Sequence, residues 1–202
     1  MTVVERLLDS NGLIDPKKHA AFMFGLDELG HPKPPTTWDD AAQRAAYQII
    51  EHSFKTWDRF SDIRDYLDYL IGLMGPDSDT SIKPEVAAEY WAIFGSICFS
   101  AGQKTHVFNK PAAMHIDEIS DILIRKQRDY GHDNISRFGR TGILIRLHDK
   151  VARLENLNRH GATPENESVV DNFIDLIGYA SIGIMWERGW YMLSLSEGGS
   201  RD

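Results

Sequence analysis

Glycine and proline residues divide this chain into pieces of helix length, and no segment alternates apolar and polar residues long enough to predict a strand. Residues 30–37 contain three prolines and predict a loop, because proline cannot continue a helix. Thr37 then predicts an N-cap, with Asp39 and Asp40 in the first turn, where the helix dipole favours anions. Comparable start and stop signals predict helices, counted with their capping residues, at 37–57, 61–74, 84–100, 111–130, 141–161 and 163–188.

Several of these boundaries depend on single residues. Ser61 is the predicted N-cap of the second helix, and Gly75 is its stop signal. Thr163 and Pro164 are predicted to cap and begin the last helix. The pattern as a whole predicts an all-α fold, a helical bundle.

A break near residues 102–111 divides the predicted bundle into two regions. Residues 1–105 form an N-terminal helical region whose role the sequence does not indicate, and residues 106–202 form a C-terminal helical region. The aromatic residues of the first region are predicted to lie in the core rather than to form a ligand platform. They include Trp38, Trp57, Tyr66, Tyr69 and Trp91.

Composition narrows the classes of function. The 202 residues, 42% of them hydrophobic, suffice for one domain that folds without disulfides, and the single Cys98 cannot form an internal one. Glu5 precedes any apolar run and no eighteen-residue apolar segment is free of charge, so we expect neither a secretory signal nor a membrane partner, and a cytoplasmic location. A net charge of −8 argues against nonspecific binding of duplex nucleic acid, but it allows a small phosphate ligand at a local basic cluster.

Two acidic residues interrupt the most apolar segment of the chain. Asp171 and Asp175 lie four residues apart, on one face of a helix that is predicted to be central and buried. Two like charges in that position repel each other, and burying them without partners is costly, so a positive group must face them. Either a divalent cation such as Mg²⁺ or a pair of ion pairs to arginine satisfies this requirement.

The preceding helix carries basic residues on one side. Arg146, Lys150 and Arg153 fall at i, i+4 and i+7, with Asp149 next to them. Placed beside the acidic helix, this basic row would suit a triphosphate, with Mg²⁺ on the carboxylates and the cations on the remaining phosphate charge. In the alternative interpretation, the two rows pair with each other.

Residues 126–142, at the end of the predicted helix 111–130 and before the basic helix, are expected to form a loop that is rich in glycine. Its aromatic residues Tyr130 and Phe138 are candidates to stack on a base. Its polar side chains are candidates to hydrogen-bond a base or a phosphate: Asn134, Arg137 and Arg140. The glycine spacing is neither a Walker loop nor a dinucleotide fingerprint.

An ordered series of motifs in this part of the chain resembles a known family. The motifs are Lys126-x-x-Asp-Tyr-Gly, Arg137-Phe-Gly, Arg146-Leu-x-Asp-Lys-x-x-Arg-Leu-x-Asn-Leu157 and Asp171-x-x-x-Asp-Leu-Ile-Gly-Tyr-Ala180. Over residues 115–190 they resemble phage and bacterial proteins with the nucleotide-modification-associated domain, which we place beside the MazG-like, all-α nucleoside triphosphate pyrophosphohydrolases.

The resemblance implies a helical bundle, a homo-oligomer in the cytoplasm (of the host, for a phage protein), and Mg²⁺ as cofactor. It also implies cleavage of a nucleoside triphosphate into the monophosphate and pyrophosphate. Carried over by position, Asp175 and Asp149 would be metal ligands, together with Asp171, which stands one residue upstream of the place of the family's glutamate; Glu167 is the alternative to Asp149. Lys150 and Arg153, with Arg146, would stabilise charge on the phosphoryl group. The expected nucleotide contacts are Lys126, Asp129, Tyr130, Asn134, Arg137 and Arg146.

The first acidic motif of the family, E-x-x-E, is incomplete in this chain. Asp149 stands at its start, but Ala152 and Arg153 stand where the second acid is expected. The site would then hold a single metal, recruit Glu167 or Glu118, or have lost hydrolysis. The sequence therefore predicts a pyrophosphohydrolase, with a non-catalytic nucleotide-binding protein and a helical interaction module as alternatives.

Overall fold

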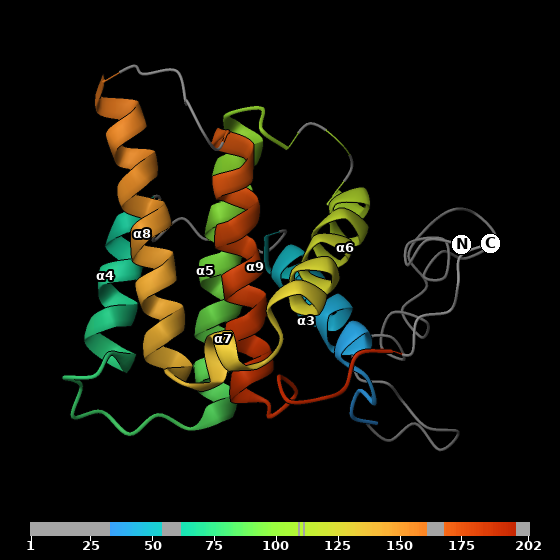
Figure 1. The fold of residues 1–202 in the computed structure, drawn as a ribbon. Helices are drawn as coiled ribbons and strands as arrows, with labels where there is room; N and C mark the ends of the chain where they lie inside the picture. Colours follow the sequence, from blue (N-terminus) through green and yellow to red (C-terminus); the bar gives the residue numbers. More distant parts are fainter. Residues whose placement is uncertain (1–32, 54–61, 109, 111, 161–167, 197–202) are drawn as a thin grey trace.

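The computed structural model describes residues 33–53, 62–108, 110, 112–160 and 168–196, and these contain helices and no strand. In Figure 1, α4, α5, α8 and α9 run along one direction, and α3 and α6 are inclined to them. The prediction of an all-α bundle is confirmed. The helices are α3 (Trp38–Ser53), α4 (Ile63–Met74), α5 (Pro84–Lys104), α6 (Ala112–Tyr130), α7 (Asp133–Ser136), α8 (Gly139–His160) and α9 (Val169–Glu187).

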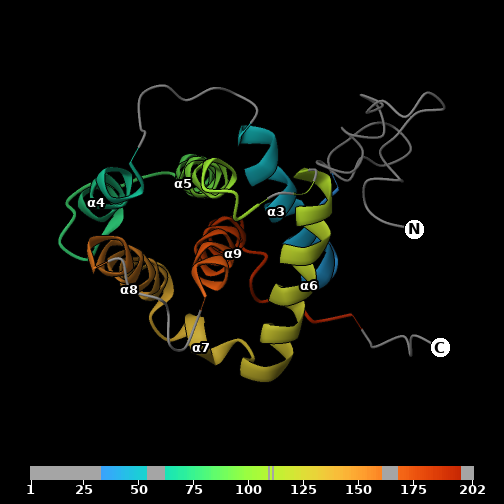
Figure 2. The same ribbon diagram turned by 90° about the horizontal axis from the view of Figure 1, so that it is seen from above.

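Helix α9 lies at the centre of the bundle, with α5, α8 and α6 around it (Figure 2). It is long and apolar enough to cross a membrane, but more than half of it is buried inside the bundle, which accounts for its composition. Gly183 lets α9 approach α5 closely, because a Cβ atom there would lie 2.5 Å from the Trp91 ring. The central, buried helix predicted from its apolar composition is confirmed.

One hydrophobic core joins the helices on both sides of the break near residue 105. It contains residues of α3, α4 and α5 together with residues of α6, α8 and α9. Helix α3 packs against α5, α6 and α9, so the N-terminal region contributes directly to the surroundings of the C-terminal helices.

The predicted core aromatics are confirmed in part. Trp38, Tyr66 and Trp91 are fully buried. Tyr69 is 42% exposed and packs on the rim, where its ring lies 5.9 Å from that of Tyr90. Trp57 lies outside the described residues.

The helix boundaries follow local capping. The Thr37 side chain accepts a hydrogen bond from the Asp40 amide, as predicted. Helix α4 is capped by Asp62, whose carboxylate accepts from the Arg64 amide at 2.7 Å, rather than by Ser61, which lies outside the described residues.

The predicted start of the last helix is wrong. Residues 161–167 lie outside the described part, but Ser168 has extended backbone angles and is the N-cap of α9. Ser168 and Asp171 form a capping box, in which each side chain accepts from the other residue's amide. This local motif determines where α9 begins, five residues after the proline signal.

Candidate functional site

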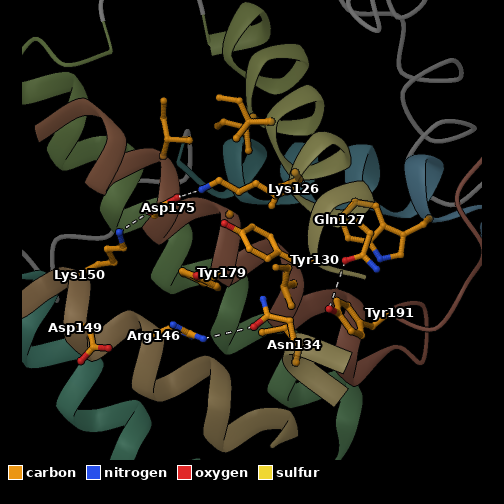
Figure 3. Close-up of a pocket in the computed structure, with 18 residues that line it drawn as sticks. Lys126, Gln127, Tyr130, Asn134, Arg146, Asp149, Lys150, Asp175, Tyr179 and Tyr191 are labelled. Carbon is orange, nitrogen blue, oxygen red and sulfur yellow. Dashed lines mark hydrogen bonds and ion pairs between the residues drawn. The ribbon is translucent and has the colours of Figure 1, made fainter. Parts of the chain in front are cut away.

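A cavity of about 270 Å³ opens between α6, α8 and α9, and α7 and the segment after α9 contribute to its walls. Isoleucine and leucine side chains from α6 and α9 form its apolar walls, including Ile119, Leu123 and Ile174. Polar side chains point into or around this cavity in Figure 3. They are Lys126, Gln127, Tyr130, Asn134, Arg146, Asp149, Lys150, Asp175, Tyr179 and Tyr191.

Asp175 is the centre of charge in this pocket. Its carboxylate forms ion pairs with Lys126 of α6 and with Lys150 of α8, the second at 2.7 Å (Figure 3). The Asp175 side chain is 10% exposed, whereas Lys150 is 18% and Lys126 is 47% exposed. The ion-pair alternative therefore holds for Asp175, with lysines in place of the predicted arginines.

Asp171 does not share this environment. Its side chain is exposed and accepts hydrogen bonds from the Ser168 amide at 2.9 Å and the Ser168 hydroxyl at 2.7 Å. These bonds, and to a lesser extent the charges of Lys126 and Lys150, lower the pKa of Asp171. The expectation that both aspartates are buried is wrong for Asp171, because the helix begins at Val169 and places Asp171 in its first turn.

Four of the predicted nucleotide contacts line the cavity with Lys150 and Asp149. Lys126 belongs to the ion pair just described, and Tyr130 lies at the mouth with 65% of its surface exposed. Arg146 donates a hydrogen bond to Asn134 Oδ1 at 3.5 Å. Residues 126–142, predicted as one loop, are mostly helical, because they comprise the end of α6, all of α7 and the start of α8. This segment and the basic row of α8 meet at one opening, as predicted.

Other predicted site residues lie elsewhere. Arg153 is partly buried on α8 but is not part of the cavity wall, and Asp129 is exposed on α6 away from it. Arg137 is exposed and lies over the Phe138 ring, 5.7 Å from its centroid. Glu167 lies outside the described residues.

Two further candidates from the sequence belong to ion pairs outside the cavity. Arg140 holds Glu187 through two hydrogen bonds, at 2.7 and 2.6 Å. Glu118 binds Lys110 and His115, which lower its pKa, with the Lys110 hydrogen bond as the larger cause.

The described residues do not fit the predicted magnesium site. Among them, no group of three or more histidine, cysteine, aspartate or glutamate side chains lies close enough to hold a metal ion. Two ammonium groups already bind the carboxylate of Asp175, and Asp171 serves as a helix cap. Of the described residues, the exposed Asp149 is the one that presents a further carboxylate to the cavity.

The inner end of the cavity contains residues that sequence reasoning missed. Gln127, Tyr191 and Trp38 line it, and the Tyr191 hydroxyl donates to Gln127 Oε1 at 3.5 Å. Gln127 has a signal in the sequence, because it falls on the buried stripe of α6 that Ile116 and Leu123 begin. Tyr191 and Trp38 have none, because distant parts of the chain bring them to the pocket.

Tyr179 links the two ends of the cavity. Burial, followed by the charge of Asp175, raises the pKa of Tyr179. Burial, followed by the charge of Tyr179, raises the pKa of Tyr191 to about 12. Both hydroxyls are therefore protonated at neutral pH and can donate hydrogen bonds.

Comparison with known families finds a match over a part of the chain that includes most of the polar residues of this site. Residues 126–186 match a family model described as Nucleotide modification associated domain 1. The matched segment contains the three charged residues at the centre of the pocket, Lys126, Lys150 and Asp175, and leaves the helices before it unassigned. Searches of curated proteins and of solved structures found no match to the chain.

Proposed function

We propose that this protein binds a nucleoside triphosphate in the pocket between α6, α8 and α9. The observation that carries the proposal is the charge at the opening. Among the described residues that line the cavity, Lys126, Lys150 and Arg146 stand beside two carboxylates, Asp149 and Asp175, so these residues carry an excess of positive charge on a chain of net charge −8. Such a local excess attracts an anion of several charges.

The shape of the pocket suggests how the nucleotide lies. A cavity of about 270 Å³ is small for a whole triphosphate but can take a base and part of a sugar. Its walls are apolar inside and charged at the mouth, so the base is placed inside and the phosphates at the lysines. Both ammonium groups can turn toward phosphate oxygens, because lysine is a flexible point charge.

Asp175 holds the two lysines together while no phosphate is present. It pairs with one lysine from each neighbouring helix, so it keeps two like charges close that would otherwise repel each other. Phosphate oxygens would then share or replace the contacts of Asp175. This arrangement makes the anion site part of the packing of α6 against α8 and α9.

Hydrolysis to the monophosphate and pyrophosphate, in the manner of the MazG-like enzymes, is the second candidate. Asp149 favours it, because this exposed carboxylate lines the same cavity as Lys150 and would lie near the phosphates. Lys150 and Arg146 would stabilise charge on the transferring phosphoryl group. Since the described residues do not assemble a metal site, Mg²⁺ is assigned here only as the counterion that a triphosphate carries.

Calorimetry with each common nucleoside and deoxynucleoside triphosphate, with and without Mg²⁺, tests binding. Lys150→Ala and Lys126→Ala should each weaken binding by about ten- to a hundredfold, because each removes a charge-assisted hydrogen bond. Lys104→Ala is the matched control, since this lysine is exposed at the end of α5, outside the cavity wall. Failure of every nucleotide to bind at millimolar concentration overturns the proposal.

Chromatography of the same mixtures separates the two candidates. Monophosphate and pyrophosphate should appear if the protein is a hydrolase, and Asp149→Asn should then slow their release. Binding without products, across common and modified nucleotides, leaves a nucleotide-binding protein.

A further inference from the structure

Two hydrogen-bond donors are buried beside the inner end of the cavity without a partner among the described residues. They are Nε2 of Gln127 and Nε1 of Trp38, in side chains that are 5% and 0% exposed. Both residues line the cavity. Buried polar groups are nearly always hydrogen-bonded, so two such atoms at one cavity point to acceptors that a ligand supplies.

These donors lie away from the phosphate end. Figure 3 shows Gln127 and Tyr191 on one side of the pocket and Lys150 with Asp175 on the other, with Tyr130 and Tyr179 between them. A nucleotide whose phosphates bind the lysines therefore directs its base toward Gln127. Trp38 lines the cavity beside Tyr191, and the centroids of the two rings lie 6.4 Å apart in an edge-on arrangement.

We infer that this inner end selects a pyrimidine-2,4-dione, the base of uridine and thymidine nucleotides; the inference rests on the proposed nucleotide binding. Such a base has two carbonyl oxygens on either side of one N–H group. The carbonyls accept from Gln127 Nε2 and Trp38 Nε1, and the N–H donates to Gln127 Oε1. That oxygen can take a new donor in place of Tyr191, because its contact with Tyr191 is long at 3.5 Å and therefore weak.

Adenine satisfies this set of donors and acceptors less well. A glutamine amide can pair with adenine in a bidentate manner, so Gln127 alone does not exclude it. The indole N–H of Trp38 supplies the difference, because the dione has an acceptor on each side of its N–H, whereas the edge of adenine that pairs with an amide has a ring-nitrogen acceptor on one side of its amino group only. Both donor nitrogen atoms are buried, so the side chains that carry them would have to shift slightly for a base to reach them.

Competition calorimetry with dUTP, dTTP, dCTP, dGTP and dATP tests the inference. The unmodified protein should bind dUTP or dTTP at least about tenfold more tightly than dATP, since a donor left unpaired on binding carries a penalty of that order. Trp38→Phe keeps the ring and removes the donor, so it should bring the two affinities within about threefold. Gln127→Leu should weaken the binding of every base.

Two residues elsewhere provide matched controls. Trp91→Phe removes an indole donor that binds Glu187, and Gln48→Leu removes a buried amide that binds Glu89. Neither residue lines the cavity, so both variants should keep the preference for the dione. A further ligand tests the inference with the unmodified protein, so the result does not depend on whether a variant folds. A pyrimidin-2-one deoxynucleoside triphosphate, which lacks the 4-carbonyl, should bind about tenfold less tightly than dUTP.

The outcomes separate the inference from the function on which it rests. If dATP binds as tightly as dTTP while Lys150→Ala weakens both, the nucleotide site stands and the base selection is wrong. If Trp38→Phe leaves a measured preference unchanged, the preference arises elsewhere and the inference also fails. If no nucleotide binds, both proposals fall.

Discussion

Helix α9 carries two acidic side chains that are almost equally buried, one in its first half and one at its C-terminal end. Asp175 is 10% exposed and faces Lys126 and Lys150. Glu187, twelve positions later, is 4% exposed and faces Arg140, whose guanidinium binds both of its carboxylate oxygens. Trp91 Nε1 donates a further hydrogen bond to Glu187 at 3.3 Å.

The difference lies in what surrounds each carboxylate. At Glu187 the planar arginine fork binds both oxygens, and neither Glu187 nor Arg140 is among the described residues that line the cavity. At Asp175 the partners are two flexible ammonium groups at the edge of a cavity, with Arg146 adding further positive charge. An ion pair of the first kind holds the fold together, whereas one of the second kind can exchange partners with a ligand.

Removal of the arginine at the closed end should have the largest effect on stability. Arg140→Ala leaves the buried Glu187 carboxylate with only the Trp91 hydrogen bond, and we expect a loss of about 3 kcal/mol in the free energy of unfolding. Urea denaturation followed by circular dichroism measures it. Arg137→Ala is the control, because this exposed arginine contacts only the Phe138 ring among the described residues and should change stability by less than about 0.5 kcal/mol. An equal effect of the two substitutions would contradict the assignment of a closed ion pair.

Two glycines of α9 also differ in their surroundings, because Gly183 packs against a rigid ring and Gly178 lies beside the cavity. A Cβ atom at Gly183 would lie 2.5 Å from the rigid Trp91 ring, so Gly183→Ala should cost about 2 kcal/mol through overpacking. At Gly178, beside the cavity, it would lie 3.1 Å from the Leu123 side chain, which can move into open space. Gly178→Ala should therefore cost less than about 1 kcal/mol. Thermal unfolding of the two variants tests the order, which the reverse result would contradict.

Much of the open end could be predicted from the sequence. The apolar surroundings of Asp175 predict that it is buried, and the i, i+4 spacing of Arg146 and Lys150 predicts a basic row opposite it. Both predictions depend on the periodicity of long helices. In the structure, Lys150 forms an ion pair with Asp175, in agreement with them. The loop motif that begins at Lys126 likewise predicted residues of the pocket mouth.

The sequence predictions fail where a single capping residue, or a contact between distant parts of the chain, determines the position of a side chain. Asp171 changes from a buried ligand to an exposed cap because Ser168, rather than Thr163, begins α9. Trp38 reaches the cavity because α3 packs against α6 and α9, which no short-range pattern in the sequence specifies. Arg140 resembled the other loop arginines in sequence, and only the fold brings it to Glu187.

The role of Asp171 as a cap predicts a stability effect that depends on pH. Its pKa is lowered in the folded protein, so its contribution is present above the unfolded value of about 3.9 and is lost as the pH falls through the folded value. Asp171→Asn should reduce stability by about 1 kcal/mol at pH 7 and by progressively less in acid. Denaturation curves at several pH values measure this. If the substitution instead left stability unchanged and weakened only the magnesium-dependent binding of nucleotide, Asp171 would be a metal ligand rather than a cap.

Substitution of Asp175 should produce the smallest of these effects, a change in the free energy of nucleotide binding. The sign of this change shows whether Asp175 is a partner of the two lysines or a metal ligand. Asp175→Asn removes the negative charge that competes with phosphate for Lys126 and Lys150. In the absence of Mg²⁺, nucleotide affinity should rise by about three- to fivefold, which corresponds to at most about 1 kcal/mol for a pair near the surface. A metal ligand would behave in the opposite way, because its loss would leave metal-free binding unchanged and weaken binding in the presence of Mg²⁺. Calorimetry at low salt, with EDTA and then with Mg²⁺, measures both. The same exchange is not expected at Glu187, because its arginine binds both carboxylate oxygens and does not line the cavity.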